Sequence, residues 1–311
     1  MLSNDRSIAV LMATYNGETY LASQLDSLLG QSLRDFTCYI HDDGSSDGTL
    51  EILREYEEKY PDVFVIVPGP GTGGARENFL FLMRTVESDY YMFCDQDDVW
   101  LENKIERTFA ELKKYDERIP QCVYTDLRVV DAGLSTICGS FFENSHLDPH
   151  LNATKDLLMT NVCVGCTMII NRYLRDLCIK GNFKAVIMHD WAAVLIASCF
   201  GGLHLLNEAT MLYRQHGTNE IGVNNELSLP AKLVRAVDVR AFLQRKKFYR
   251  ERQSLMAAEI LQVEGLPKAA EEFLGEAAGI YKRSKIQRMR FYRRHDMFRQ
   301  RNNKLWQLLW L

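Results

Sequence analysis

The sequence has no apolar run long enough to cross a lipid bilayer. A transmembrane helix needs about 20 consecutive apolar residues, and the best candidate, Trp191 to Phe200, is much shorter. Near the N-terminus, the apolar segment from Ile8 to Met12 is too short for the core of a signal peptide, and no cleavage pattern follows it. We therefore expect a cytoplasmic protein, free or peripheral to a membrane.

The sequence also lacks the two pairs of ligands that a structural zinc site needs. The eight cysteines are scattered, mostly in apolar surroundings, and Cys163 and Cys166 form a C-x-x-C pair. A structural zinc site needs a second pair of ligands at similar spacing, and the sequence has none. Reduced, buried thiols are the simpler interpretation.

A Walker A loop is missing, although one segment is rich in glycine. Between Pro68 and Arg76, an arginine follows Ala75, where a Walker A loop has lysine and then serine or threonine. The amides of this segment and the Arg76 guanidinium can still approach a phosphate or a base. A flexible loop is the alternative. No nucleic-acid recognition module is present elsewhere.

What the chain does contain is a repeating pattern of strands and helices. Its 311 residues, 47% of them hydrophobic, suffice for one large domain or two modest ones. Short apolar runs at Ile8–Ala13, Phe36–Ile40 and Phe64–Val67 alternate with helical spacing from Glu18 and from Thr49. This alternation predicts an α/β fold with right-handed parallel crossovers.

A fourth apolar run, Tyr90 to Cys94, ends in Asp95-Gln96-Asp97-Asp98. Such a run indicates an interior parallel strand, whose carboxyl end is where open α/β sheets bind ligands. Carboxylates this close repel one another, so we expect a divalent cation to hold them. The alternative is that Asp97 and Asp98 only cap a helix beginning near Val99.

Later segments are predicted less regularly. Cys122–Tyr124 and Leu127–Val130 are expected to form a hairpin or sheet extension, 141–154 a loop, and Val162–Ile170 a core strand with Gly165 close to a ligand. A short strand is expected at Leu203–Leu206.

Two further polar clusters can carry chemistry. His189-Asp190-Trp191 precedes an apolar helix, where Asp190 can serve either as an N-cap or as a functional acid. Arg214 and His216 lie in one turn and can hold a diphosphate or complete a metal shell, although a lone histidine in a loop is often structural.

The C-terminal part has a different character. From about Asn224 the sequence becomes helical, so we expect a catalytic region over 1–224 and a helical region over 225–311. Between Tyr281 and Lys304 there are ten lysines or arginines and one aspartate, interleaved with apolar residues. This composition predicts an interfacial helix on an anionic membrane, with RNA binding or a solvated helix face as alternatives.

Taken in order, the motifs resemble those of the family 2 glycosyltransferases, which are inverting enzymes with the GT-A fold that use sugar nucleotides. The resemblance runs from Ile8 to about Gly222. It rests on Thr14-Tyr15-Asn16-Gly17, Asp42 to Asp47, Gly74 to Phe79 and Asp95 to Asp98. The details around Asp98, Asp190 and His216 resemble the bacterial rhamnosyltransferase branch, which assembles rhamnose polysaccharides of the cell wall or capsule.

The resemblance implies a GT-A-type, mainly parallel sheet and a set of roles. Asp97 and His216 would hold Mg²⁺ or Mn²⁺, Asp95 would approach the ribose or the metal, and Asp98 would cap the next helix or orient its neighbours. Asp190 would be the catalytic base, although many relatives have an acid where this chain has His189. Nucleotide contacts are implied for Thr14, Tyr15, Asn16, Asp42 or Asp43, and Arg76, and substrate contacts for Trp100, His189, Trp191 and Arg214.

The resemblance also implies the partners. These are a sugar-nucleotide donor, with dTDP-rhamnose favoured, and a lipid-linked glycan acceptor at the inner face of the membrane. The oligomeric state stays open, with a homodimer as one arrangement. Two other functions remain: nucleotidyl transfer onto a sugar phosphate, which normally has a glycine-rich signature after the first strand, and a non-catalytic scaffold that binds sugar nucleotides.

Overall fold

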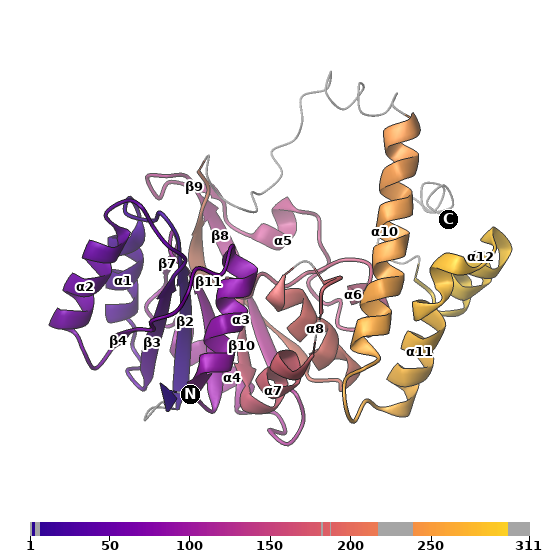
Figure 1. The fold of residues 1–311 in the computed structure, drawn as a ribbon, viewed down its shortest axis with the longest axis horizontal. Coiled ribbons are helices and arrows are strands. Elements are labelled where there is room, and N and C mark those ends of the chain that lie inside the picture. Colours follow the sequence, from indigo (N-terminus) through magenta and orange to yellow (C-terminus); the bar gives the residue numbers. More distant parts are fainter. Residues whose placement is uncertain (1, 4–6, 182, 187, 217–238, 298–311) are drawn as a thin grey trace.

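The computed structural model describes residues 2–3, 7–181, 183–186, 188–216 and 239–297. In these ranges, helices cover a large mixed sheet, and further helices follow at one end (Figure 1). The strands are β1 (Leu2–Ser3), β2 (Ile8–Thr14), β3 (Phe36–Asp42), β4 (Phe64–Ile66), β5 (Val86–Glu87), β6 (Tyr90–Asp95), β7 (Val99–Trp100), β8 (Cys122–Val130), β9 (Thr136–Cys138), β10 (Ile169–Asn171) and β11 (Leu203–Arg214). The helices are α1 (Leu21–Leu29), α2 (Thr49–Lys59), α3 (Ala75–Thr85), α4 (Lys104–Leu112), α5 (Phe141–Asn144), α6 (Thr154–Leu157), α7 (Arg172–Lys180), α8 (His189–Cys199), α10 (Val239–Ile260), α11 (Lys268–Ala278) and α12 (Lys285–Arg294), with 3₁₀ turns η1 (Gly165–Thr167) and η2 (Ile280–Lys282).

The main sheet has the order β4-β3-β2-β6-β10-β8-β11-β7, and β9 pairs with β8. Strands β4, β3, β2 and β6 are parallel, as the sequence predicts. Strand β10 is antiparallel to both of its neighbours, whereas β8 and β11 are parallel to each other. The expected GT-A-type sheet, mixed and mainly parallel, is therefore confirmed.

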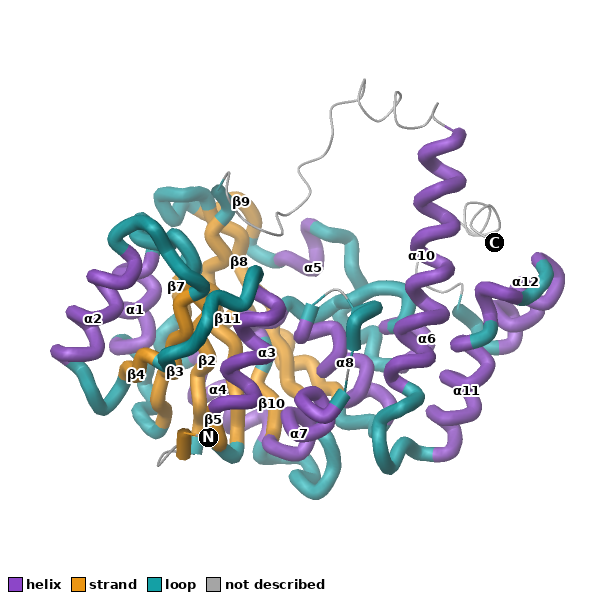
Figure 2. The backbone as a smooth tube through the Cα atoms, in the orientation of Figure 1, coloured by secondary structure: helices purple, strands orange, loops and turns teal. Residues whose placement is uncertain are grey.

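The interior strands are apolar on both sides because helices cover both faces of the sheet (Figure 2). Along β2, Ala9 and Leu11 belong to one apolar cluster, while Ile8, Val10 and Met12 belong to the other. Helices α3, α7 and α8 contribute to the first cluster, and α1, α2 and α4 to the second. Two cores thus fix the central strands, and the polar residues follow where the strands end.

Several segments differ from the expectation. A 3₁₀ turn and the short strand β10 replace the long strand predicted over Val162–Ile170. Strand β8 is one continuous strand that extends the main sheet, which is the second of the two arrangements expected, and β11 continues to Arg214 because it pairs along β8. The expected loop over 141–154 contains α5. These differences arise because pairing partners far apart in the sequence decide where a strand ends.

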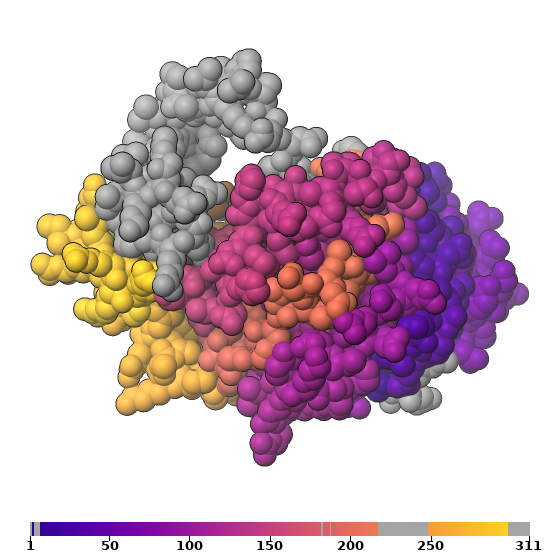
Figure 3. All heavy atoms as spheres, turned by 180° about the vertical axis from the view of Figure 1, so that it is seen from behind, coloured from indigo at the N-terminus to yellow at the C-terminus, as the bar shows by residue number. Residues whose placement is uncertain are grey.

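The C-terminal helices pack together at the end of the molecule opposite α1 and α2 (Figures 1 and 3). The Tyr292 hydroxyl lies 3.3 Å from Gln253 Oε1 of α10, and the Phe291 and Phe273 rings stack with centroids 6.0 Å apart. The position of Phe291 and Tyr292 in the basic segment suggested that they face a membrane. Both side chains are buried instead, so they do not. The predicted boundary near Asn224 lies outside the described residues. In the described ranges, no helix combines the length and apolar character needed to cross a membrane.

Candidate active site

Three strands present polar side chains at neighbouring carboxyl ends. In the parallel register, Thr14 of β2 lies opposite Asp42 of β3, and Ala13 lies opposite Asp95 of β6. The Thr14 hydroxyl donates to Asp42 Oδ2 at 2.9 Å. Because the strands are parallel and in register, three motifs far apart in the sequence meet at one edge of the sheet.

Asp42 holds the loop that follows it. Its carboxylate accepts hydrogen bonds from the Gly44 and Ser45 amides, at 3.1 and 2.8 Å, and from the Ser45 hydroxyl at 2.6 Å. Asn16 Oδ1 accepts from the Ser46 amide of the same loop at 2.8 Å. The structure thus shows Asp42 and Asn16 organising two adjoining loops.

The turn after β2 is joined to the acidic loop after β6. The Tyr15 amide donates to Gln96 Oε1 at 2.8 Å, and Gln96 Nε2 donates to the Tyr15 carbonyl at 2.9 Å. A Cβ on Gly17 would lie 2.3 Å from Gln96 Oε1, so any larger residue here would displace the Gln96 side chain from Tyr15. The Tyr15 side chain remains 57% exposed, which leaves its ring available to a ligand.

Asp43 is bound by the glycine-rich loop. Its carboxylate accepts hydrogen bonds from the Thr72 amide and hydroxyl and from the Gly73 and Gly74 amides. Burial raises the pKa of Asp43, but these hydrogen bonds lower it by more than burial raises it. The net pKa of Asp43 therefore lies below its usual range. The loop amides proposed to meet a phosphate or base are therefore bonded to a carboxylate of the chain itself.

Asp97 and His216, the two predicted metal ligands that are farthest apart in sequence, are brought together. His216 Nε2 lies 2.8 Å from Asp97 Oδ2, and the imidazole packs on the Tyr20 ring at a centroid separation of 4.8 Å. Both side chains are mostly buried. A carboxylate and an imidazole in contact at a strand end form a donor pair that fits a divalent cation.

Arg214 has a positioning role in the structure. Its guanidinium donates to the Asp97 carbonyl at 2.8 Å and to the Ala132 carbonyl at 2.6 Å, and it lies over the Tyr20 ring. The residue is only 4% exposed. Arg214 was expected to contact the substrate. In the structure its hydrogen bonds instead hold the loop that carries Asp97.

Asp98 does not cap the following helix. The chain forms strand β7 directly after it, and α4 begins only at Lys104. Asp98 instead accepts a hydrogen bond from the Arg214 amide at 3.0 Å, so it does orient its neighbour. Burial, together with the charges of Asp95 and Asp97, raises its pKa well above the usual range.

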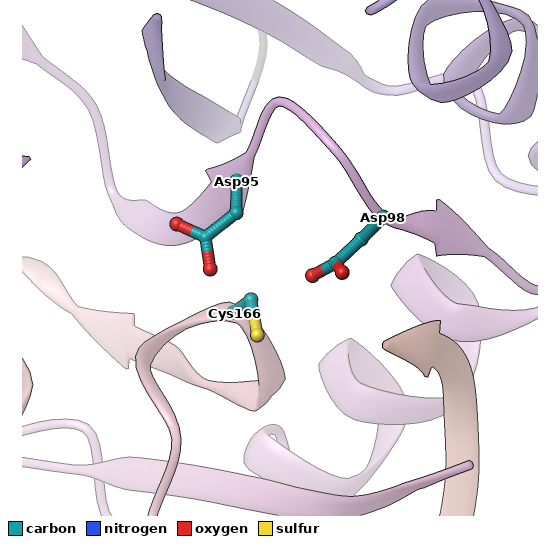
Figure 4. Close-up of side chains that lie close together, drawn as sticks. All are labelled: Asp95, Asp98 and Cys166. Atoms are coloured by element: carbon teal, nitrogen blue, oxygen red, sulfur yellow. The ribbon is translucent and has the colours of Figure 1, made fainter. Parts of the chain in front are cut away.

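The 3₁₀ turn η1 lies between the acidic loop and Asp190. The Gly165 amide donates to Asp190 Oδ2 at 3.1 Å, and the next residue, Cys166, groups with Asp95 and Asp98 (Figure 4). Asp190 is in the first turn of α8 and also accepts from the Trp191 amide at 2.5 Å. Burial raises its pKa to about 7, although these two amides lower it in part.

His189 is an uncharged residue buried between two rings. It packs on Phe79 and Phe93 at centroid separations of 4.3 and 4.7 Å, and neither ring nitrogen has a hydrogen-bond partner in the part of the chain that the structure describes. Burial, and to a lesser extent the charge of Arg76, lowers its pKa to about 3. His189 and Arg76 line one cavity of about 120 Å³ between α3, α7 and α8.

The other predicted contact residues have structural partners. Arg76 donates to the Phe183 carbonyl at 2.7 Å and pairs with Glu77. Trp100 is 2% exposed and belongs to the core, so the structure excludes it from an open sugar-binding wall. Trp191 is partly buried, and its indole donates to the Leu157 carbonyl at 2.8 Å.

The sequence patterns predict no site role for Gln96 or Tyr20, and they predict Cys166 only as a reduced, buried thiol. Gln96 stands inside the acidic motif, but its uncharged amide gives no signal of metal binding or acid–base chemistry. Tyr20 and Cys166 come from distant segments, and only the folded sheet brings them to the acids. Gly165 did give a signal, as a glycine within an apolar run.

The sheet order and the acids at its carboxyl edge define a GT-A-type glycosyltransferase fold. A family model described as glycosyl transferase family 2 matches residues 9–178. The chain therefore belongs to glycosyl transferase family 2.

A relative supports this placement. The dTDP-rhamnosyl transferase RfbG of Shigella flexneri is 30% identical over 257 residues, which cover 79% of this chain and 83% of that protein.

Solved structures share the fold. TarS of S. aureus, residues 1–349 in complex with UDP-GlcNAc, superposes with a TM-score of 0.59 at 17% identity, covering 94% of this chain and 73% of that one. The mannosyltransferase PcManGT of Pyrobaculum calidifontis, in complex with GDP-Man and Mn²⁺, gives a TM-score of 0.50 at 16% identity, covering 93% and 73%.

Proposed function

We propose that the protein is an inverting glycosyltransferase that moves a sugar from a nucleotide donor to a glycan acceptor. The observation that carries this proposal is the turn Gly165-Cys166, which joins Asp190 on one side to the acidic loop on the other. Asp190 lies on one side of this turn and the acids proposed to hold a metal lie on the other. Asp190 can therefore take the proton of the attacking hydroxyl while the metal stabilises the leaving diphosphate.

The donor nucleotide is assigned to the edge formed by β2, β3 and β6. Tyr15 offers an exposed ring to the base, and Asp95 ends the strand beside Ala13. Asp42 and Asp43 shape the edge through the loops that they hold. Because Arg76 is 24% exposed at its side chain, it can turn from Glu77 toward a phosphate or base.

The residues present fit a divalent cation. Asp97 and His216 are the proposed ligands, and Asp95 is the further candidate. When bound, Mg²⁺ or Mn²⁺ would neutralise charge on the diphosphate leaving group. Arg214 and Asp98 hold the backbone of the loop that carries Asp97, because the Arg214 amide bonds to Asp98 and its guanidinium bonds to the Asp97 carbonyl.

Asp190 is the proposed catalytic base. The acceptor hydroxyl attacks the anomeric carbon from the face opposite the diphosphate, and its proton passes to Asp190. The bond between that carbon and the diphosphate oxygen breaks, and its electron pair leaves with the diphosphate. A base with a pKa near 7 combines proton affinity with a substantial ionised fraction at neutral pH.

We propose L-rhamnose, supplied as dTDP-rhamnose, as the donor sugar. The support is the similarity to the dTDP-rhamnosyl transferase of Shigella flexneri. His189 is the residue that we assign to the sugar, because its buried nitrogens need hydrogen-bond partners that a sugar hydroxyl can supply. Trp191 follows it on the same helix turn.

The proposed acceptor is a lipid-linked glycan of bacterial polysaccharide synthesis, reached from the inner face of the membrane. Helix α12 and the turn before it, 281–294, carry seven lysines or arginines and no acid. Ile286 and Met289 project from it with 63% and 37% exposure. Exposed apolar side chains among cations favour an anionic lipid surface. The basic segment from Tyr281 onward is accordingly proposed as the membrane-associating part of the C-terminal helical region, and a homodimer is one arrangement of the chain.

Calorimetric titration with dTDP-, UDP- and GDP-sugars, each with Mg²⁺ or Mn²⁺, tests the proposal. We expect dTDP-rhamnose to bind most tightly and only with metal. Tighter binding of another nucleotide would overturn the donor assignment. Binding of a sugar phosphate together with a nucleoside triphosphate would instead favour nucleotidyl transfer, and donor binding without transfer to any acceptor would favour a scaffold.

A further inference from the structure

Asp95, Asp98 and Cys166 form a compact group beneath the acidic loop. One ligand atom from each residue lies within 4.8 Å of the others. Figure 4 shows the two carboxylates facing one another, with the Cys166 sulfur beside the gap between them. The two acids flank the Gln96-Asp97 turn, and Cys166 comes from η1.

The group is buried but not fully bonded. Asp98 is 0% exposed, and its Oδ2 has no hydrogen-bond partner of normal geometry among the described residues, although the Cys166 thiol interacts with the carboxylates of both Asp98 and Asp95. Cys166 is 2% exposed. A buried carboxylate oxygen without a partner is costly, and nearly all such groups in proteins are satisfied by a donor, a water or an ion. The orphaned oxygen therefore points to a ligand in this gap.

We propose that Asp95, Asp98 and Cys166 bind a thiophilic divalent cation of the Zn²⁺ class. The ligand set differs from the Asp97–His216 pair because it contains a sulfur and the buried acid. Zn²⁺ accepts thiolate and carboxylate ligands together, with bonds of about 2.0–2.3 Å, whereas Mg²⁺ prefers oxygen. A fourth position remains for water, and the thiol proton is released to solvent on binding.

The gap is suited to this ion after a small closure. Tetrahedral coordination at these bond lengths places ligand atoms about 3.5 Å apart, so the side chains must approach by about 1 Å. Asp98 is anchored by the Arg214 amide, and Cys166 by the short turn that holds it. Rotation of the Asp95 side chain at the end of its strand can provide the movement.

Lys104 offers the competing explanation for the buried acid. It is fully buried, interacts electrostatically with Asp98 and Cys166, and donates to the Thr210 hydroxyl at 3.2 Å. If its charge alone balances Asp98, the gap will not take up a cation. Metal binding by the native protein decides between the two accounts.

Occupation of this gap has a consequence that rests on the proposed function. Asp95 would be shared between the thiophilic ion and the donor nucleotide, so Zn²⁺ should weaken donor binding supported by Mn²⁺. Zinc would then act as an inhibitor at the reaction site. The binding claim itself does not depend on transfer.

Cadmium titration of the full chain under reducing conditions tests the binding claim. Cd²⁺ replaces Zn²⁺ and gives an ultraviolet charge-transfer band when a thiolate binds it. We expect one equivalent to produce the band in the native protein, Cys166→Ser to remove it, and Cys163→Ser to keep it. Cys163 is the matched control because it is also buried but belongs to the other apolar cluster. Asp98→Asn should weaken Cd²⁺ binding by at least about tenfold.

Three results would overturn the inference. They are absence of the band in the native protein, an unchanged band in Cys166→Ser, and native affinity in Asp98→Asn. Thermal unfolding of each variant, compared with the native protein, shows whether the chain is folded. Because the band is read without donor or acceptor, a failure here leaves the proposed transferase function standing, and a failure of transfer leaves this site standing.

Discussion

Replacement of Asp190 by asparagine should greatly slow transfer and at the same time change how stability depends on pH. The carboxylate is buried, and its pKa is raised to about 7, compared with about 3.9 in an unfolded chain. An acid with a raised pKa favours the folded state at low pH, and this contribution is lost as the pH rises through 7. The loss amounts to about 4 kcal/mol in total, of which about 2.5 kcal/mol falls between pH 5 and pH 8.

Urea unfolding at pH 5 and pH 8 measures this contribution. We expect the native protein to lose about 2.5 kcal/mol more than Asp190→Asn between the two pH values. Asparagine also loses a hydrogen bond, but that loss lowers the unfolding free energy of the variant equally at both pH values. It therefore drops out of the difference between pH 5 and pH 8. Asp126→Asn is the matched control, since Asp126 is also buried and accepts two backbone amides, from Leu127 at 2.8 Å and Phe141 at 3.0 Å.

Transfer should respond in the opposite direction to pH. Because the base must be ionised, the rate of the native protein should rise with pH through about 7. Asp190→Asn should lose transfer by a factor of about 100 to 10,000 and still bind the donor. The reasoning would be refuted if the unfolding free energies of the native protein and Asp190→Asn changed equally between pH 5 and pH 8. It would also be refuted if the variant transferred the sugar at a rate comparable to that of the native protein.

Three further predictions concern the metal ligands, the glycine-rich loop and the basic helix. Asp97→Asn and His216→Ala should each weaken metal-dependent donor binding in calorimetry, and EDTA should bring the native protein to the level of the variants; donor binding insensitive to EDTA would contradict the metal role. Asp43→Asn should cost about 1–3 kcal/mol in urea unfolding, because an amide cannot accept all the bonds from the glycine-rich loop; unchanged stability would show that the loop holds itself. Ile286→Ser combined with Met289→Ser should reduce sedimentation with anionic but not neutral vesicles, and equal sedimentation would exclude this face.

The sequence predicted the first half of the fold well. Continuous apolar runs such as Ile8–Met12 identify strands buried on both faces, and the parallel register then places Thr14, Asp42 and Asp95 together. Segments whose pairing is decided at long range were predicted poorly. Strand β10 inserts antiparallel between β6 and β8, and nothing in its local pattern indicates this position.

The roles of the site residues remain predictions, and the structure shows only which of these residues lie together. Asp97 and His216 meet as the family resemblance implies. The local pattern could not show that Asp43 occupies the amides of the glycine-rich loop or that Trp100 lies in the core, because both depend on how separate loops pack.

A crystal structure with dTDP-rhamnose and Mn²⁺ tests the central claim most directly. The account predicts the diphosphate at Asp97 and His216, with the anomeric carbon between that edge and Asp190, so that Asp190 faces the side opposite the leaving oxygen. A donor bound elsewhere, or Asp190 on the same side as the diphosphate, would contradict it.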